Sequence, residues 1–468
     1  MSSPLICPLV DGTRLVVPDA LDLITPYVLR EQQDWFEDEI KFLRRWLQPG
    51  QQVIDIGANY GVYTVSMAQA VGAQGRVWAF EPASSTAQWL AQSVALNAMP
   101  QVTLDQRALS SHVGTAQLSL NDNAELNALV RGASAHSACE TVPLVTLDSC
   151  LAQYGWRDID FLKIDAEGEE MNILLGGAHF FSALSPLVQY EIKVDGPPDL
   201  QLVRRFEAMG YASYRLVPGL DVLVPFDPAT PPDAYQLNLF CCKPDRAAQL
   251  AEAQFLVLPG QPPGPPAATR LADLLARHPA QAPLPYQVQC AQTWAQATAH
   301  PSAETQEVLQ ALALYQVSQD TRQTAVDRFW ALDTGFQQIQ QVCERQASHL
   351  RMASLARIAR ACGARTVAVS ALGQLCDLIF QEQRVDASEP FVPPCPRYDA
   401  MAPGSAVGNW VLASALEELE RLVGFSSFYT GLSSRQRLET FLQLGVESPE
   451  MARRLQLLQE RFHLPTAA

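Results

Sequence analysis

The chain has 468 residues, of which 48% are hydrophobic and 18% charged, a composition typical of a globular protein. Asp and Glu outnumber Lys and Arg by 49 to 33, and the formal charge of −16 excludes the clustered basic surface that nucleic-acid binding requires. No apolar run reaches about 18 residues, so we expect no membrane span. The ten cysteines form no CxxC pair and the first residues show no signal-peptide pattern, so we expect reduced thiols, no structural metal site and a cytoplasmic location.

The length predicts two or three domains, and the residue patterns divide the chain into two. Residues 1–245 alternate short apolar runs with amphipathic stretches, which predicts an α/β domain with a mostly parallel sheet; residues 1–48 form its N-terminal flank and first helix. Residues 246–268 are rich in Pro and Gly and predict a linker. Residues 269–468 predict a mainly helical domain of unknown role.

In chain order, the first predicted element is an amphipathic helix over residues 31–47, which ends at Pro49 and Gly50. Strands are expected at residues 52–56, 77–81, 102–108, 161–165 and 187–192, with helices at 63–71, 84–97 and 169–176 between them. Three further strands, 213–216, 221–224 and 235–242, are expected to close the sheet. In the second half, helices are expected at 271–277, 303–316, 321–333, 337–360 and 411–421, and residues 366–372 could form a strand or a short helix.

A glycine-containing turn follows the first strand of the predicted sheet, in the stretch Val53-Ile-Asp-Ile-Gly-Ala-Asn-Tyr-Gly-Val-Tyr-Thr64. Gly57 and Gly61 let the backbone turn tightly and approach a ligand. The helix that begins directly afterwards presents unpaired N–H groups to a polar or anionic group. The two glycines stand four residues apart, which is not the dinucleotide pattern GxGxxG.

An acidic residue, Glu81, ends the second strand about twenty residues after Gly61. A carboxylate at this place suits a bidentate hydrogen bond to a ribose diol. Because the same placement serves NAD and S-adenosylmethionine, it indicates a nucleoside and does not identify a reaction.

A third motif, Asp160-Phe-Leu-Lys-Ile-Asp-Ala-Glu-Gly-Glu-Glu170, brings charged groups to the end of another strand. Alternation along the strand places Lys163 and Asp165 on one face. Ligands of open α/β sheets bind beyond the carboxyl ends of the strands, so Asp165 and Glu167 should border the cofactor crevice. The alternative is that Asp165 is merely the cap of the next helix, but a lysine inside an apolar strand needs a partner, which favours a functional interpretation.

Four blocks together resemble the FkbM family of methyltransferases: Asp55-Ile-Gly-Ala-Asn-Tyr-Gly61, Phe80-Glu-Pro82, Val145-Thr-Leu-Asp148 and Phe161-Leu-Lys-Ile-Asp-Ala-Glu-Gly-Glu169. The stretch from Thr25 to Glu37 also resembles the N-terminal flank of that family. The resemblance covers about residues 20–245 and implies a class I, Rossmann-like methyltransferase fold with a seven-stranded sheet. It implies S-adenosylmethionine as the cofactor and methylation of a hydroxyl on a sugar, glycan or natural product. By matching position, it implies that the methionine part of the cofactor is lined by Asp55, Gly57, Asn59 and Gly61, and the ribose by Glu81.

Methyl transfer to a hydroxyl requires an aligned acceptor oxygen and a general base, because an aliphatic hydroxyl does not ionise by itself at pH 7. Asp165 is the first candidate for the base and Glu167 the second, and Lys163 would hold Asp165 ionised. Glu191, at the end of the neighbouring strand, could join Asp165 around the acceptor or a divalent ion, or could be an ordinary strand-end acid. His136 could cover the acceptor pocket or lie exposed in a loop.

Two other functions remain open from the sequence. A nucleotide-dependent oxidoreductase is disfavoured by the missing GxGxxG turn. A non-catalytic binding protein on a methyltransferase fold is disfavoured by the intact set of cofactor residues. The expected partner is a small-molecule or glycan acceptor, while residues 269–468 could carry a homo-oligomer or protein contact. The sequence leaves open the acceptor, the need for a metal and the oligomeric state.

Overall fold

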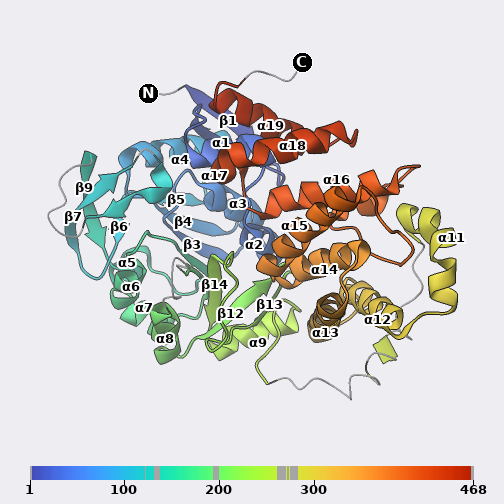
Figure 1. Cartoon of the computed structure of the whole chain (residues 1–468). Coiled ribbons are helices and arrows are strands. Elements are labelled where there is room, and N and C mark those ends of the chain that lie inside the picture. Colours follow the sequence, from blue (N-terminus) through green and yellow to red (C-terminus); the bar gives the residue numbers. More distant parts are fainter. Residues whose placement is uncertain are drawn as a thin grey trace. The chain divides into compact units, whose positions relative to one another are not determined.

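The computed structural model of the chain describes residues 3–121, 123–130, 138–192, 200–260, 270, 273–274 and 283–464. The chain forms two compact units (Figure 1). Unit 1 comprises Met1–Leu216, Leu223–Pro232 and Gln236–Ala253, and unit 2 comprises Val217–Val222, Asp233–Tyr235 and Gln254–Ala468. The chain therefore leaves unit 1 at three places, so the predicted linker is not the only stretch that connects the two units.

Unit 1 is built around an eight-stranded sheet of order β13-β12-β14-β11-β10-β3-β4-β5. Its strands are β3 (Gln52–Ile56), β4 (Arg76–Phe80), β5 (Val102–Asp105), β10 (Phe161–Ile164), β11 (Leu187–Glu191), β12 (Ala212–Val217), β13 (Val222–Pro225) and β14 (Asn238–Cys242). Strands β11, β10, β3, β4 and β5 are parallel, and β14 pairs antiparallel with β11 and β12. The predicted α/β fold with a mostly parallel sheet is confirmed. The sheet has eight strands, as many as the residue patterns predicted, whereas the family resemblance implied seven.

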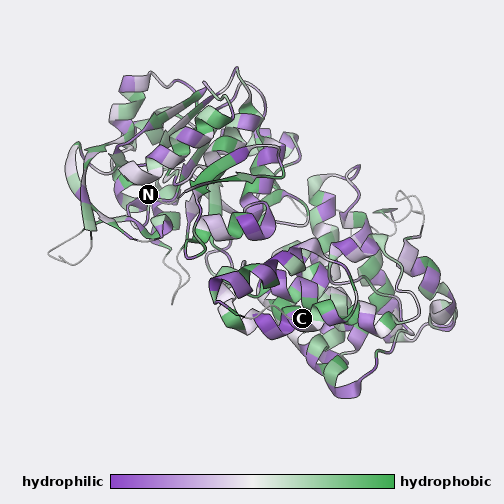
Figure 2. Ribbon diagram, turned by 90° about the horizontal axis from the view of Figure 1, so that it is seen from above, coloured by the Kyte–Doolittle hydropathy of each residue, from purple (hydrophilic) through white to green (hydrophobic). Residues whose placement is uncertain are grey.

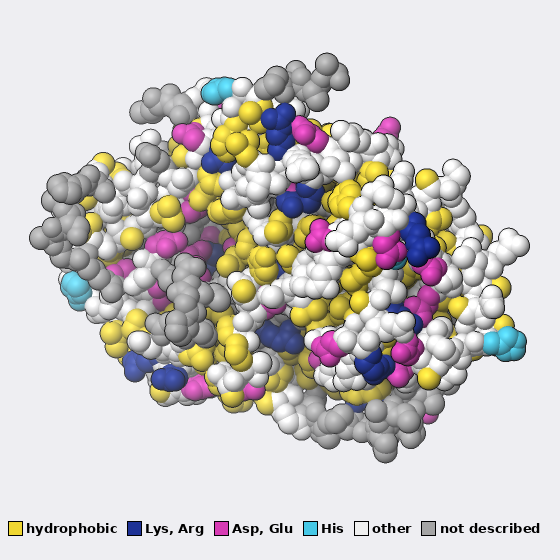
Figure 3. All heavy atoms as spheres, in the orientation of Figure 1, with side chains coloured by type: hydrophobic (Ala, Val, Ile, Leu, Met, Phe, Trp, Pro, Cys, Tyr) yellow, Lys and Arg dark blue, Asp and Glu magenta, His cyan; other side chains and the backbone are white. Residues whose placement is uncertain are grey.

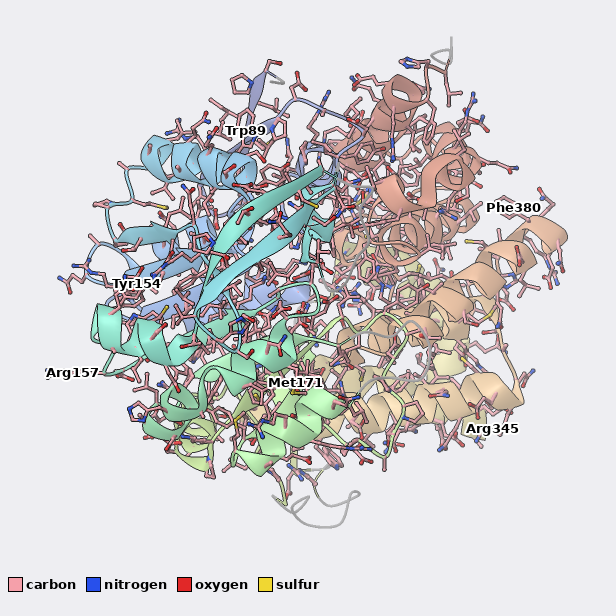
Figure 4. The ribbon with its side chains drawn as sticks, turned by 90° about the vertical axis from the view of Figure 1, so that its left-hand side faces the viewer. Trp89, Tyr154, Arg157, Met171, Arg345 and Phe380 are labelled. Carbon is pink, nitrogen blue, oxygen red and sulfur yellow. The ribbon has the colours of Figure 1, made fainter. Side chains whose placement is uncertain are left out.

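Helices connect the parallel strands of unit 1. They are α1 (Ile24–Gln32), α2 (Asp38–Trp46), α3 (Val62–Val71), α4 (Ser84–Leu96), α5 (Leu147–Tyr154), α6 (Glu170–Leu175), α7 (Ala178–Ala183), α8 (Gln201–Ala208) and α9 (Pro244–Glu252). The strand residues Ile54, Leu162 and Val188 are fully buried in one hydrophobic cluster, as expected for parallel strands covered on both faces. Tyr154, labelled in Figure 4, ends α5 and stacks on Trp156 with 5.5 Å between ring centroids.

Two smaller sheets complete unit 1. The strands β1 (Pro4–Pro8) and β2 (Arg14–Pro18) pair antiparallel, and a four-stranded sheet of order β6-β9-β7-β8 contains β6 (Ala108–Leu109), β7 (Gly114–Leu120), β8 (Ala128–Leu129) and β9 (Ala138–Val145). The predicted strand 102–108 is therefore wrong at its end. Strand β5 stops at Asp105, whose carboxylate accepts the backbone N–H of Arg107 at 3.1 Å. This bond turns the chain, so that Ala108 joins the four-stranded sheet, which is called the smaller sheet below.

The N-terminal segment forms two helices where the sequence predicted one at 31–47. Helix α1 ends at Gln32 and is followed by Gln33, whose backbone is left-handed with a φ of 59°, a conformation that terminates helices. Helix α2 begins only after Glu37, which is extended. The break places Trp35 and Glu37 in a loop, where both line a cleft of unit 1.

The described part of unit 2 consists mainly of helices. They are α11 (Pro285–Ala299), α12 (Ala303–Ser318), α13 (Ala325–Arg345), α14 (His349–Cys362), α15 (Arg365–Glu382), α16 (Val407–Leu422), α17 (Ser427–Thr430), α18 (Arg435–Gln443) and α19 (Pro449–Arg461). Residues 366–372 lie within α15 and are helical. The single helix predicted at 337–360 is wrong, because the chain breaks before Ser348, whose hydroxyl caps α14 by accepting the N–H of Arg351 at 3.3 Å.

Hydrophobic and hydrophilic residues alternate along the helices of each unit (Figure 2), which is the pattern expected when one side of a helix is buried. Within the described ranges, no helix combines the length and the apolar character needed to cross a bilayer.

Candidate active site

A cleft lies beyond the carboxyl ends of β3, β4 and β10 in unit 1, and its empty space is about 1030 Å³ with the open mouth included. Seven of the residues singled out in the sequence line it: Asp55, Gly57, Asn59, Glu81, Lys163, Asp165 and Glu167. Acidic side chains are visible over this part of the sheet on the face drawn in Figure 3. The cleft also receives the loop before α2 and parts of the smaller sheet. Its place matches the ligand site of open α/β sheets.

The two glycines of the turn are required by packing inside unit 1. A Cβ on Gly57, with a φ of +76°, would lie 1.7 Å from the carbonyl oxygen of Asp165. A Cβ on Gly61, with a φ of +93°, would lie 2.3 Å from Cδ1 of Leu90. Gly61 stands directly before α3 and is not among the lining residues of the cleft. Packing inside unit 1 therefore requires both glycines, and their approach to a cofactor stays a prediction, with Gly57 among the lining residues of the cleft.

Glu81 is buried at the end of β4, with 7% of its surface exposed. Its carboxylate accepts the backbone N–H groups of Asn59 and Ala83, each at 2.9 Å. Burial raises the pKa of Glu81 to about 7, although these two hydrogen bonds lower it. Each carboxylate oxygen keeps a further lone pair, so the group can still accept the two hydroxyls of a ribose.

Lys163 is the buried centre of a charged network. Its Nζ lies 2.8 Å from Oδ2 of Asp165, 4.0 Å from Oδ1 of Asp55 and 5.0 Å from the ring centroid of Tyr63. Burial lowers the pKa of Lys163, but the two aspartates outweigh burial and leave the pKa above its usual value. Asp55 is fully buried and also accepts the Thr64 hydroxyl at 2.6 Å. The network therefore holds a permanent ammonium group beneath Asp165.

Asp165 does not cap the following helix, because α6 begins at Glu170 with Glu169 as its cap residue. The alternative interpretation of Asp165 as a helix cap is therefore wrong. The turn between them is fixed by Glu170, which accepts the N–H groups of Ala166 at 3.1 Å and Gly168 at 3.0 Å. The side chain of Asp165 is 39% exposed, so it can reach a molecule in the cleft.

Three carboxylates converge at this end of the sheet. Asp165, Glu167 and Glu191 each offer an oxygen, and the three oxygens lie within 4.8 Å of one another. Glu191 ends β11, the neighbour of β10, although it is not among the residues that line the cleft. Carboxylate oxygens suit Mg²⁺ or Ca²⁺, and they equally accept hydrogen bonds from hydroxyl groups.

Glu37 and Tyr63 are among the cleft residues that were not assigned a role from the sequence. The Tyr63 hydroxyl donates to Oε2 of Glu37 and accepts from Nε2 of Gln189 at 3.3 Å. Burial raises the pKa of Glu37, while the Tyr63 hydrogen bond and the charge of Lys163 lower it. The available signal was the resemblance of the stretch before residue 38 to a family flank.

The smaller sheet supplies lining residues that no sequence pattern indicated. Glu125, between β7 and β8, accepts the backbone N–H of Thr25 at 3.1 Å and also its hydroxyl. Arg107 lines the cleft with its guanidinium 2.7 Å from a carboxylate oxygen of Asp105. His136 lies outside the described residues.

Residues 55–213 match the family model described as the methyltransferase FkbM domain. Unit 1 carries an FkbM methyltransferase domain. The match contains the end of β3 and all of β4, β10 and β11, and it confirms the resemblance seen in the sequence blocks. It begins at Asp55, so the loop that carries Glu37 precedes the matched segment. A search of curated proteins finds no significant match to the chain.

Several solved structures are similar to part of the chain. A SAM-dependent O-methyltransferase from Thermotoga maritima is 15% identical with a TM-score of 0.25, over 51% of this chain and 77% of that chain. An rRNA methylase from Streptococcus thermophilus is 13% identical with a TM-score of 0.25, over 44% and 93%. A SAM-dependent methyltransferase from Aquifex aeolicus is 12% identical with a TM-score of 0.26, over 46% and 92%. Likenesses at this level carry no argument about substrate or mechanism.

Proposed function

We propose that this chain transfers the methyl group of S-adenosylmethionine to a hydroxyl oxygen of a sugar, glycan or natural product. The observation that carries the proposal is the convergence in one cleft of a buried carboxylate suited to a ribose, Glu81, and a half-exposed carboxylate held by a lysine, Asp165. The FkbM domain match supports S-adenosylmethionine as the cofactor.

The cofactor would lie across the carboxyl ends of β3 and β4. Glu81 would accept the two ribose hydroxyls through the lone pairs that Asn59 and Ala83 leave free. The turn after β3 and the first residues of α3 would surround the methionine part, because backbone N–H groups at a helix start attract a carboxylate. The acceptor would then enter beside Asp165.

The chemistry asks the protein to align two groups and to remove one proton. When bound, S-adenosylmethionine supplies a methyl group activated by a positive sulfur, which leaves as a neutral thioether with the electron pair of the broken bond. Asp165 would take the proton of the attacking hydroxyl on Oδ1, because Oδ2 is held by Lys163 at 2.8 Å. Lys163 would thereby orient the carboxylate and balance its charge before the proton arrives.

The acceptor side suits a molecule with more than one hydroxyl. Glu167 and Glu191 each place a carboxylate oxygen within 4.8 Å of one of Asp165. One hydroxyl of a vicinal diol could therefore donate to Glu167 or Glu191 while the neighbouring hydroxyl is methylated. Such groups are frequent in sugars and in oxygenated natural products. A divalent cation bound by the same oxygens would instead orient the acceptor through coordination.

The proposal is tested by titrating S-adenosylhomocysteine, the product form of the cofactor, onto the full chain by calorimetry. Replacing Glu81 by Ala should weaken binding by about 1.5–3 kcal/mol, because charge-assisted hydrogen bonds to the ribose are lost. The matched control is Asp158→Ala, since the Asp158 side chain is 74% exposed and lies outside the cleft residues. The control should bind as the wild type does.

Two results would count against the proposal. The first is a wild-type chain that shows no heat of binding with S-adenosylhomocysteine. The second is an equal affinity for wild type and Glu81→Ala while Glu81→Ala keeps the wild-type melting temperature. Transfer of a tritiated methyl group to members of a panel of sugars and glycans, followed by mapping of the labelled oxygen, then identifies the acceptor class.

A further inference from the structure

The loop before α2 brings Glu37 to the wall of the cleft from outside the matched domain. The FkbM match begins at Asp55, whereas Trp35 and Glu37 line the cleft from the preceding segment. The break between α1 and α2 is what allows this, because Glu37 stands just outside α2 with an extended backbone. A continuous helix over these residues would not leave the loop in which Glu37 stands.

The Glu37 carboxylate is held in place by the first turn of α3. Tyr63 donates its hydroxyl to Oε2 of Glu37, and Gln189 on β11 donates to the same hydroxyl at 3.3 Å. This chain of hydrogen bonds fixes the Tyr63 hydroxyl as a donor toward Glu37. Tyr63 is the second residue of α3, so its side chain links Glu37 to the helix start, where the methionine part of the cofactor is proposed to bind.

The charges around Lys163 leave room for a second cation. The carboxyl groups of Asp165, Asp55 and Glu37 all act on this one ammonium group, so the described cluster places three acidic side chains around one basic side chain. Lys163 forms ion pairs with Asp165 at 2.8 Å and with Asp55 at 4.0 Å, whereas the hydrogen bonds to Glu37 come from the neutral side chains of Tyr63 and Trp35. Glu37 is partly buried, and a nearby cation favours the charged form of such a carboxylate.

We propose that Glu37 binds the α-ammonium group of the cofactor's methionine part. This inference rests on the proposed function, because it takes S-adenosylmethionine to be the cofactor. Asp55 is less suited to the task, since it is fully buried and directed toward Thr64 and Lys163. Glu81 is already assigned to the ribose. The N-terminal flank thereby completes the cofactor site that the matched domain forms in part.

The test compares two ligands that differ in the ammonium group alone. S-adenosylhomocysteine carries the group, and its desamino analogue keeps the adenosine, the sulfur and the carboxylate but lacks it. Calorimetry on the full chain should show that Glu37→Gln weakens S-adenosylhomocysteine about 10- to 100-fold, as expected for a hydrogen bond between two charged groups. The same variant should bind the desamino analogue within about twofold of wild type.

Two further variants sharpen the result. Asp38→Asn removes a neighbouring charge that is paired with Lys41 at 3.0 Å, and it should bind both ligands as the wild type does. Tyr63→Phe removes the hydroxyl that holds Glu37 and should weaken S-adenosylhomocysteine more than the analogue. Melting temperatures establish that each variant is folded.

Three outcomes have distinct meanings. Equal weakening of both ligands by Glu37→Gln overturns the inference, because the residue would then only support the shape of the cleft. Unchanged binding of S-adenosylhomocysteine also overturns it and moves Glu37 to the acceptor side. Failure of the wild type to bind either ligand instead overturns the proposed function itself, and the inference with it.

Discussion

Buried charge is arranged differently in the two units. In unit 2, the side chains of Glu420 and Arg454 are each 1% exposed, and Arg437 lies 2.6 Å from Glu420. These residues belong to α16, α19 and α18, so their ion pairs join three helices. In unit 1, Glu81 and Lys163 are also buried, but both line a cleft.

The comparison teaches that burial of a charged residue does not by itself indicate a functional site. In unit 2 the cost of removing charge from water is offset by partners within the protein. In unit 1 the cluster around Lys163 contains an excess of carboxylates and faces empty space. The proposed cofactor, with its ammonium group and positive sulfur, would add a cation to this cluster.

The largest expected effect concerns Asp165, the proposed general base, because a catalytic cleft needs this residue for methyl transfer and a cleft that only binds does not. Replacing Asp165 by Asn should lower the rate of methyl transfer by about 10²–10⁴ and leave the affinity for S-adenosylhomocysteine nearly unchanged. Single-turnover kinetics with an accepted hydroxyl compound measures the first quantity, and calorimetry the second. If the variant instead loses cofactor binding but keeps its turnover at saturation, Asp165 belongs to the cofactor shell and the base must be sought at Glu167 or Glu191.

The second prediction concerns the network of buried ion pairs in unit 2. Replacing Arg454 by Met should reduce the free energy of unfolding by about 3–5 kcal/mol, because Glu420 and Glu450 then lose a buried partner. Arg453→Met, at the partly exposed neighbouring position, is the control. Urea denaturation measures the loss, and S-adenosylhomocysteine affinity should stay as in the wild type. A weakened cofactor affinity without loss of stability would mean that this network serves the cleft.

The smallest effect is a pH dependence that belongs to the cleft alone. Glu81 has its pKa raised to about 7, and ribose hydroxyls bind best to its ionised form. The affinity for 5′-methylthioadenosine, which lacks the amino-acid part, should therefore rise roughly tenfold between pH 6 and pH 8 and then level off. Without ligand, the free energy of unfolding changes with pH in the opposite direction. The folded chain keeps a proton that the unfolded chain releases above 4.5, so the contribution of Glu81 to stability falls as the pH rises from 4.5 to about 7.

Calorimetry at several pH values measures this dependence. Glu81→Gln should bind the ligand weakly at every pH and show no rise. A wild-type affinity that stays constant from pH 6 to pH 8 would contradict the role assigned to Glu81.

The part of the site formed by strand ends could be predicted from the sequence, because strand ends and acidic residues leave local signals. Asp55, Glu81, Lys163 and Asp165 each follow or end an apolar run, and parallel strands bring such ends together. Glu37 could not be assigned in this way. The predicted helix 31–47 concealed the left-handed break that turns its loop toward the cleft.

The smaller sheet and much of the helical half were also beyond the sequence patterns. The strands β6 and β8 have two residues each, too few to show alternation, so the lining residue Glu125 carried no signal. In unit 2, the break before α14 depends on a single serine cap. Such caps are short-range features that a continuous apolar pattern masks.

The central claim, that the cleft of unit 1 binds S-adenosylmethionine with Glu81 at the ribose and Asp165 at the reacting end, is tested most directly by a crystal structure of the full chain with S-adenosylhomocysteine. The account predicts both ribose hydroxyls within about 2.6–3.2 Å of the Glu81 carboxylate and the open side of the sulfur facing Asp165. A ligand found elsewhere, or in this cleft with its ribose away from Glu81, would contradict the account.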